Sequence, residues 1–364
     1  MELIKNGSQI IQTLIDNAKY SGENAVTVTG NYEIDSTIRI PSDFVLTLSN
    51  CYLRMADNTF CNMFTNASCG SEKSHTLEGT DRNITIQGVG RAILDGGEYN
   101  GLCERNSLKD GRPHISVNNL LLFANVDGFR VTGLHCRNQR WWALNFLFCR
   151  NGYIGNIDFL SDYSTIDEEG NRHWGLSRNK EHGYGSVYIK NSDGIDLRSG
   201  CHDIIIENIT GFTEDDTVAL TCLAGKLEQM YDVPELSHDI YNVIVRNVIS
   251  SAFCSNVRLL NQGGMKLYNI LVDGVMDSSK DSPYLDRGGL GVNFGDNHMY
   301  GSRHATPDET YNITIRNVTS RAASALRVSG AMQDCLFENI RIFDNENGKC
   351  IDDLATVDIS GFIR

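Results

Sequence analysis

The chain has 364 residues, a length that suggests two globular domains or one elongated domain. A net charge of −14 argues against nucleic acid or an anionic membrane as a partner, and no apolar run approaches the ~18–20 residues of a membrane span. The chain starts without a signal-peptide pattern, and its 11 scattered cysteines contain no C-x-x-C pair, so we expect a cytoplasmic protein with reduced thiols and no metal site or cofactor.

Residues 8–22 predict an amphipathic helix at the start of the chain. Ser8 is a candidate N-cap, and Gly22 follows the expected end of the helix. Five apolar residues share one face: Ile10, Ile11, Leu14, Ile15 and Ala18. We expect this helix to cover the open end of a solenoid, where strand edges and core would otherwise be exposed.

A six-residue pattern recurs along the chain, in the order apolar, any, apolar, any, Asn or Gly, apolar. It starts at Ile84, Phe129, Ile204, Val243, Ile270, Ile313 and Cys335, with steps of 45, 75, 39, 27, 43 and 22 residues. The short steps indicate a turn of roughly 22–27 residues, and the long ones indicate further turns or inserted loops. The Asn or Gly suits a left-handed bend between strands.

This repeat predicts an all-β fold, a single-stranded right-handed parallel β-helix that forms one domain over residues 1–364. The strand segments alternate with period 2 and have no helices between them, which disfavours βαβ units. A β-sandwich is the competing fold, but its regular Asn-Gly hairpin turns are scarce in this chain.

Acidic residues return after about one turn of the solenoid, at Asp193 and then at Asp215 and Asp216. Residues one turn apart lie roughly 4.8 Å apart in a parallel coil, so these three carboxylates should face one surface. Asp196 is expected to point away or to cap the turn. Mutual repulsion should raise at least one pKa in the cluster and supply both an acid and a base, as glycoside hydrolysis with inversion requires. Solvated acidic loop residues are the alternative.

Segments over about residues 20–340 resemble glycoside hydrolase family 28, the polygalacturonase family. "NSDGIDL" from Asn191 and "TEDDTVAL" from Thr213 are similar to its Asn-Thr-Asp-Gly and Gly-Asp-Asp segments, and "VRLLNQGG" from Val257 is similar to its Arg-Ile-Lys segment. The segments at 93–98, 112–134 and 141–146 follow the family's order.

The resemblance implies roles for individual residues. Asp215 would be the general acid, Asp193 and Asp216 would hold and activate the attacking water, and Arg258 would bind substrate. Asn191 and His238 are further substrate-binding candidates. In an inverting site, the acid and base carboxyl groups should lie roughly 6.5–9.5 Å apart.

Two departures from the family pattern weaken the expectation of ordinary polygalacturonate cleavage. Leu260 replaces the family's Lys, and no Gly-His-Gly follows the acid pair. His238 lies at about the expected distance but has no glycine on either side.

Two insertions are expected to form loops that flank the cleft, at 168–186 and 284–304. The first holds Trp174, Lys180 and His182, which suit stacking on a sugar and contact with its polar rim. Trp141 and Trp142 alternate in a strand, so one is expected to be core and the other to line the groove. In the insertion at 284–304, His298 and His304 are not expected to bind metal. A separate segment, 223–239, is predicted to be a loop.

The sequence therefore predicts a glycoside hydrolase that acts on a pectin-related or other plant-derived oligosaccharide or polysaccharide, with carbohydrate as its only expected partner. Two alternatives stay open. A uronate lyase or epimerase of the same fold would need a calcium ion and a basic residue, whereas a non-catalytic carbohydrate-binding protein would have no need for stacked acids.

Overall fold

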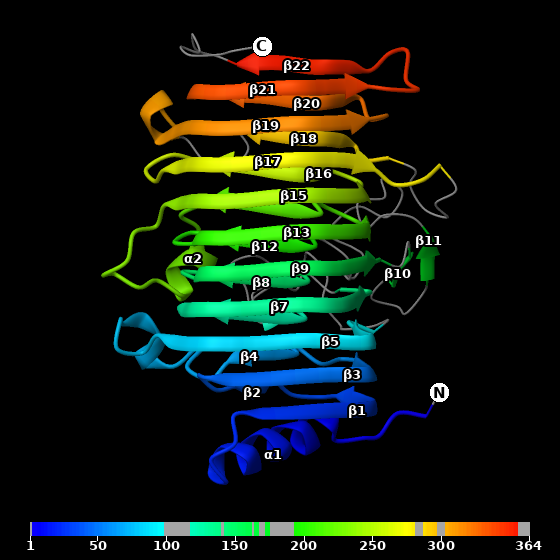
Figure 1. The fold of residues 1–364 in the computed structure, drawn as a ribbon, viewed down its shortest axis with the longest axis vertical. Helices are drawn as coiled ribbons and strands as arrows, with labels where there is room; N and C mark the ends of the chain where they lie inside the picture. Colours follow the sequence, from blue (N-terminus) through cyan, green and yellow to red (C-terminus); the bar gives the residue numbers. More distant parts are fainter. Residues whose placement is uncertain are drawn as a thin grey trace.

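Two ten-stranded parallel sheets run along the whole molecule in a computed structural model (Figure 1). The structure describes residues 2–97, 117–139, 142–161, 164–166, 172–174, 193–280, 287–296 and 303–355. The long-strand sheet consists, in order, of β1 (Ala25–Ile34), β3 (Phe44–Met55), β5 (Asp81–Asp95), β7 (Val126–Arg137), β9 (Arg150–Leu160), β13 (His202–Thr213), β15 (Ile240–Ala252), β17 (Leu267–Asp277), β19 (Thr310–Ser320) and β21 (Gln333–Ile342).

The short-strand sheet lies behind it and consists of β2 (Ile38–Ile40), β4 (Phe64–Asn66), β6 (Leu121–Ala124), β8 (Leu144–Leu147), β12 (Ile195–Arg198), β14 (Val218–Cys222), β16 (Ser255–Asn261), β18 (Leu290–Gly295), β20 (Ser324–Gly330) and β22 (Lys349–Ala355). The remaining elements are the helices α1 (Gly7–Tyr20) and α2 (Lys226–Met230), the 3-10 turns η1 (Glu72–His75) and η4 (Pro307–Glu309), and the antiparallel pair β10 (Ser164–Ile166) and β11 (Arg172–Trp174).

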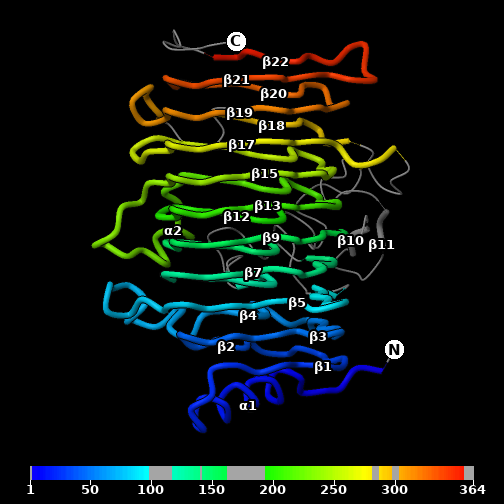
Figure 2. Tube along the Cα trace, viewed as in Figure 1, coloured from blue at the N-terminus to red at the C-terminus, as the bar shows by residue number. Residues whose placement is uncertain are grey.

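The chain alternates between the two sheets, so each long strand and the short strand after it form one coil. Successive coils stack along the molecule in Figure 2, and long strands pair only with long strands. This arrangement confirms the predicted parallel β-helix. Among the described residues, no helix is long and apolar enough to cross a membrane.

The seven pattern starts are all in register on the long-strand sheet. Ile84 pairs with Phe129, and Val243 pairs with Ile270. The 75-residue step is two coils, because β9 lies between and carries Gly152 at the apolar position. The steps of 45, 39 and 43 residues are each a single coil with additional residues between its strands.

Asparagine or glycine holds the bend of most coils in the left-handed region, as the repeat predicts. Asn208 and Asn247 have φ angles of 57° and 54°. Asn247 Nδ2 donates to Asn208 Oδ1 at 3.1 Å, and Asn339 repeats this bond to Asn317 at 2.7 Å. The bends lie inside continuous long strands rather than between separate strands. Asn is favoured because it tolerates positive φ and its amide bonds the next coil.

The core lies between the two sheets and consists of inward-facing Ile, Val, Leu and Phe side chains. Phe129 and Phe146 come from opposite sheets and stack with their ring centroids 5.0 Å apart. The ten cysteines of the described residues are free thiols. In this fold each coil buries its apolar face against its neighbours, so alternation along every strand suffices to fill the core.

Helix α1 covers the first coil, as predicted, but Ser8 is not its N-cap. Asn6 precedes the helix in a left-handed conformation, with φ at 58°. The Ser8 hydroxyl is buried and accepts backbone hydrogen bonds from Asp35 and Ser36 at 3.0 Å each. The residue therefore fastens the helix to the first coil. Ile11 and Ile15 are fully buried, whereas Ile10 and Leu14 are partly exposed at the helix edge.

Three segments that were expected to be loops contain regular structure. Residues 284–304 include β18, whose Val292 and Phe294 are fully buried core residues, because "LGVNF" alternates as a strand does. Residues 223–239 include the short helix α2. Within 168–186, the described residues 172–174 form β11, which pairs antiparallel with β10.

Candidate active site

Asp193 and Asp216 lie at equivalent positions on consecutive coils, immediately before β12 and β14. The register of Ile195 with Val218 and a hydrogen bond of 2.9 Å from Gly194 N to Asp216 O fix this alignment. Asp216 N also donates to Asp193 Oδ1 at 3.0 Å. Asp215 lies beside them, and one carboxylate oxygen from each of the three lies within 4.8 Å of the others. The predicted cluster therefore exists.

The three acids differ in exposure. Asp193 is buried, with 8% of its surface exposed, whereas Asp215 and Asp216 are partly exposed. Asp215 and Asp216 can therefore meet a substrate directly, and Asp193 lies beneath them.

Burial and mutual repulsion raise pKa values in this cluster. Burial, and then the charges of Asp196, Asp215 and Asp216, raise the pKa of Asp193 well above its ordinary range. Burial, followed by Asp215, raises the pKa of Asp216 to about 7, although Ser255 and Arg258 oppose the rise. The cluster thus retains a proton near neutral pH, as the sequence predicts.

Asp196 belongs to the same buried group, contrary to the expectation that it points away or caps the turn. It is fully buried on β12, and burial raises its pKa to about 7 against the opposing charge of Arg198. Its Oδ1 accepts from Arg198 Nη2 at 3.2 Å. Alternation along a strand puts residues 196 and 198 on one face, so the pairing was readable from "IDLR".

Arg198 continues this charged chain to helix α2 and was not singled out by sequence reasoning. Its Nη1 donates to Glu228 Oε1 at 3.0 Å, and its guanidinium lies 3.9 Å from the ring centroid of Trp142. Both Arg198 and Glu228 are buried. No short-range signal links residues 198 and 228, because they meet only when the coil closes. Trp142 is therefore a covered partner of Arg198 rather than an open stacking face.

Arg258 lies on the coil after the acid pair, on β16, in register with Ala219 of β14. Its side chain is buried and donates to the carbonyl oxygens of Leu259 and Asn293 at 3.0 Å. Its charge opposes the rise in the pKa of Asp216, so the guanidinium acts on the acid cluster. Leu260, which replaces the family's Lys, is buried on the same strand.

His238 does not lie with the acids. It follows β14 and α2, at the opposite end of the short strands from Asp216. Its Nε2 lies 2.9 Å from Asp232 Oδ1, and its ring packs edge-on against Phe148. The coil after Asp216 instead presents Ser255, whose carbonyl accepts from Thr217 N. The expectation that His238 lies beside the acids is therefore not met, because the 223–239 segment takes it to the far end of β14. That His238 binds substrate stays a prediction.

The other predicted contacts cannot be placed in the cluster. Asn191, Lys180 and His182 lie outside the described residues, as do residues 141 and 298. Trp174 is described only as part of the backbone of β11. His304 pairs with the buried Asp296, 2.5 Å from Nδ1 to Oδ2, beyond the end of β18.

The expected spacing between acid and base is not observed. Inversion was expected to need roughly 6.5–9.5 Å between the two carboxyl groups. The nearest oxygens of all three acids lie within 4.8 Å of one another. Their separation therefore does not by itself favour inversion.

No protein-family model matches the chain, and no curated protein matches its sequence. Solved structures resemble its fold. A 1,3-α-1,4-β-D-galactose-4-sulfate-3,6-anhydro-D-galactose-2-sulfate 4 galactohydrolase has a TM-score of 0.60 and 13% identity over 96% of this chain and 86% of its own. An exopolygalacturonase from Thermotoga maritima has a TM-score of 0.52 and 14% identity, over 90% and 81%.

The A-module of a mannuronan C-5 epimerase from Azotobacter vinelandii is a further match. Its TM-score is 0.54 and its identity 14%, over 91% of this chain and 72% of its own. The structural neighbours are right-handed parallel β-helix proteins, which confirms the predicted fold class. At these identities the likeness shows the fold alone.

Proposed function

We propose that the protein is a glycoside hydrolase that acts on a pectin-related or other plant-derived oligosaccharide or polysaccharide. The observation that carries the proposal is the carboxylate cluster of Asp193, Asp215 and Asp216, whose oxygens gather within 4.8 Å at the start of two adjacent short strands. Such a cluster costs free energy through repulsion, and such costs concentrate at working sites. The cytoplasmic location stays a prediction.

The resemblance to the polygalacturonase family suggests a division of labour among the acids, because Asp215 and Asp216 are both partly exposed and exposure does not distinguish them. Asp215 is partly exposed and is assigned as the general acid that protonates the leaving oxygen. Asp193 and Asp216 are joined through the Asp216 backbone N–H, so they form one unit that can hold the attacking water. Arg258, one coil further, would bind an oxygen-rich group of the substrate.

Two fold neighbours are named as a galactohydrolase of a sulfated galactose-containing glycan and as an exopolygalacturonase. Their names support a carbohydrate substrate for this chain, and the local motifs around Asp193 and Asp215 favour the polygalacturonase family within that class. Inversion rests on the family resemblance. Proton NMR of the first-formed anomer decides it, because an inverting enzyme releases the opposite anomer before mutarotation.

The decisive variant is Asp215→Asn. It should lower kcat on a natural oligosaccharide on the order of 10²–10⁴-fold, because protonation of the leaving group is lost. An activated aryl glycoside should be affected less, since its leaving group needs little protonation. Asp16→Asn, on the exposed face of α1, is the matched control and should behave like the parent. Near-normal turnover of a natural glycan by Asp215→Asn would show that the acid is misassigned.

A uronate lyase or epimerase is the second candidate, and one specific observation favours it. The three carboxylate oxygens are close enough to share a divalent cation, and one fold neighbour is named as an epimerase. A lyase would form an unsaturated product that absorbs in the ultraviolet, and an epimerase would exchange a ring proton with deuterium oxide. Chelator should abolish either reaction, whereas hydrolysis without a metal should continue in its presence.

A further inference from the structure

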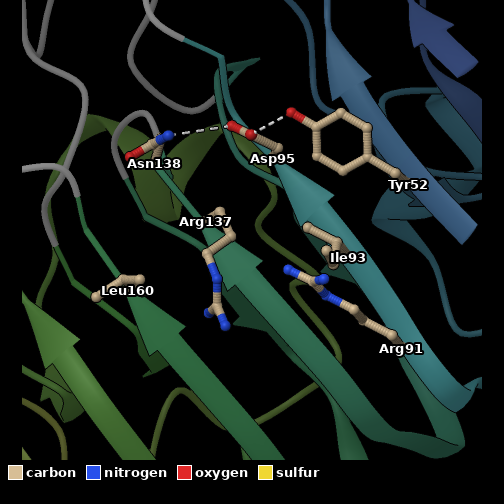
Figure 3. Close-up of a pocket in the computed structure, with 7 residues that line it drawn as sticks. All are labelled: Tyr52, Arg91, Ile93, Asp95, Arg137, Asn138 and Leu160. Atoms are coloured by element: carbon tan, nitrogen blue, oxygen red, sulfur yellow. Dashed lines mark hydrogen bonds between the residues drawn. The ribbon is translucent and has the colours of Figure 1, made fainter. Parts of the chain in front are cut away.

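A second polar recess lies on the outer face of the long-strand sheet, on coils that precede β13 and the acid cluster. It is a pocket of about 350 Å³ near the carboxyl ends of β3, β5, β7 and β9. Ile93 and Asp95 lie on this outer face, yet each is only 8% exposed. Figure 3 shows the residues that line it, drawn from strands that neighbour one another in the sheet.

Two arginines supply positive charge to this pocket. Figure 3 shows the guanidinium groups of Arg91 and Arg137 directed into the same space. Arg137 Nη2 is paired with Asp158 Oδ2 at 2.6 Å, and Arg137 Nη1 donates to the carbonyl oxygens of Cys136 and Asp158 at 2.9 and 3.2 Å. Arg91 is exposed, and among the described residues its guanidinium has no acidic partner. Asp158 neutralises Arg137, whereas the guanidinium of Arg91 can bind carboxylate or sulfate through two parallel hydrogen bonds.

Hydrogen-bonding groups gather at the other end of the pocket. Asp95 accepts from the Tyr52 hydroxyl at 2.6 Å, from Gly97 N at 2.8 Å and from Asn138 Nδ2 at 3.4 Å. These donors orient the carboxylate, which still has lone pairs to accept from a ligand hydroxyl. Apolar Ile93 and Leu160 complete the lining. The pocket thus has an anion-binding end, a hydroxyl-binding end and an apolar surface between.

From this arrangement we infer that the pocket binds a sugar that carries one oxyanion, either a carboxylate or a sulfate. The oxyanion contacts Arg91 beside the Arg137–Asp158 pair, and ring hydroxyls contact Asp95 and Asn138. The C–H face of the ring lies on Ile93 and Leu160. The pocket contains none of the three acids, but its Leu160 pairs with Phe212, three residues before Asp215. It would therefore hold a sugar unit of an acidic glycan on the coils that precede the acid cluster, rather than cleave it.

The test is a binding measurement by calorimetry or ligand-detected NMR, with the monosaccharides D-galacturonate and D-galactose and with inorganic sulfate as probes. The parent should bind galacturonate at least about tenfold more tightly than galactose, since the charge-assisted bonds are lost with the neutral sugar. Arg91→Gln should weaken galacturonate binding by about tenfold or more. Arg341→Gln, an exposed arginine on β21 of the same sheet, is the matched control and should bind like the parent.

Three outcomes would overturn the inference. The Arg91 site is wrong if Arg91→Gln and Arg341→Gln bind galacturonate equally well. Equal affinity for galactose would remove the role of the oxyanion, and equal affinity for sulfate alone would remove the role of the sugar. A second variant, Asp95→Asn, keeps an acceptor for Tyr52 and should weaken galacturonate binding but not sulfate binding. None of these measurements requires turnover, so the inference can fail or stand separately from the proposed hydrolase activity.

Discussion

The backbone N–H of Asp216 donates to the carboxylate of Asp193 across one coil of the helix, at 3.0 Å. The bond joins two residues 23 positions apart in sequence, because the coil that separates them carries only a short turn between β13 and β14. Asp193 is the more buried partner, and its pKa is raised well above its ordinary range by burial first and by its acidic neighbours second. The cluster therefore couples proton binding to the stability of the fold.

Stability should fall as pH rises through the range in which these acids ionise. A folded-state pKa above the unfolded value means that the folded chain binds more protons, so the contribution is greatest below about pH 4 and is lost toward pH 7 and above. Asp193→Asn removes the buried charge and keeps an acceptor for Asp216 N. We expect its Tm to exceed that of the parent by about 2–5 °C at pH 8 and to match it at pH 4. A lower Tm than the parent at pH 8 in scanning calorimetry would contradict this account.

The chain of Asp196, Arg198 and Glu228 should be sensitive to removal of its central cation. Arg198→Met leaves two buried carboxylates without their partner, which typically costs about 3–5 kcal/mol of unfolding free energy. Arg303→Met, which breaks an exposed pair with Glu309, should cost about 0–1 kcal/mol. Urea unfolding of both variants measures the contrast. Similar losses for the two would mean that the buried chain is not organised by Arg198.

The hydrogen-bonded asparagines at the bends of the long strands allow a test of backbone strain. Asn247 has a φ of 54° and donates to Asn208, so Asn247→Ala loses a hydrogen bond and strains the backbone. We expect a loss of about 1–3 kcal/mol of unfolding free energy. Asn247→Gly loses the same bond but adopts positive φ freely, and should be the more stable of the two. If the alanine variant were as stable as the glycine variant in urea unfolding, strain would not explain the choice of Asn here.

Substitution of Arg258 should lower kcat/KM, whereas substitution of His238 should leave it nearly unchanged. Arg258→Ala removes a charge that acts on the acid cluster, so kcat/KM should fall by about 10–100-fold on an oligosaccharide substrate. His238→Ala alters a side chain at the far end of the short strands, paired with Asp232, and kcat/KM should stay within about threefold of the parent. A large loss of kcat/KM in His238→Ala, with an unchanged Tm, would restore it to the site.

Much of the fold and part of the site follow from short stretches of sequence. The repeated pattern at Ile204, Val243 and Ile270 requires only alternation and a left-handed Asn or Gly, and the structure places all three in register. The acids at 193 and 215–216 were also readable, because the coil between them is one of the short ones and sequence spacing then equals spatial spacing.

Other relationships were decided only by the tertiary structure. His238 follows Asp216 by 22 residues, about one short turn, but the 223–239 segment makes this coil longer, so Ser255 rather than His238 lies beside the acids. The same segment brings Glu228 to Arg198.

The pocket of Arg91 and Arg137 likewise combines residues from separate coils that no local motif connects. Strand alternation and left-handed bends are set by neighbouring residues, so the sequence alone determines the repeat. No local sequence pattern sets the length of the segments between strands. That length decides which side chains lie next to one another on successive coils.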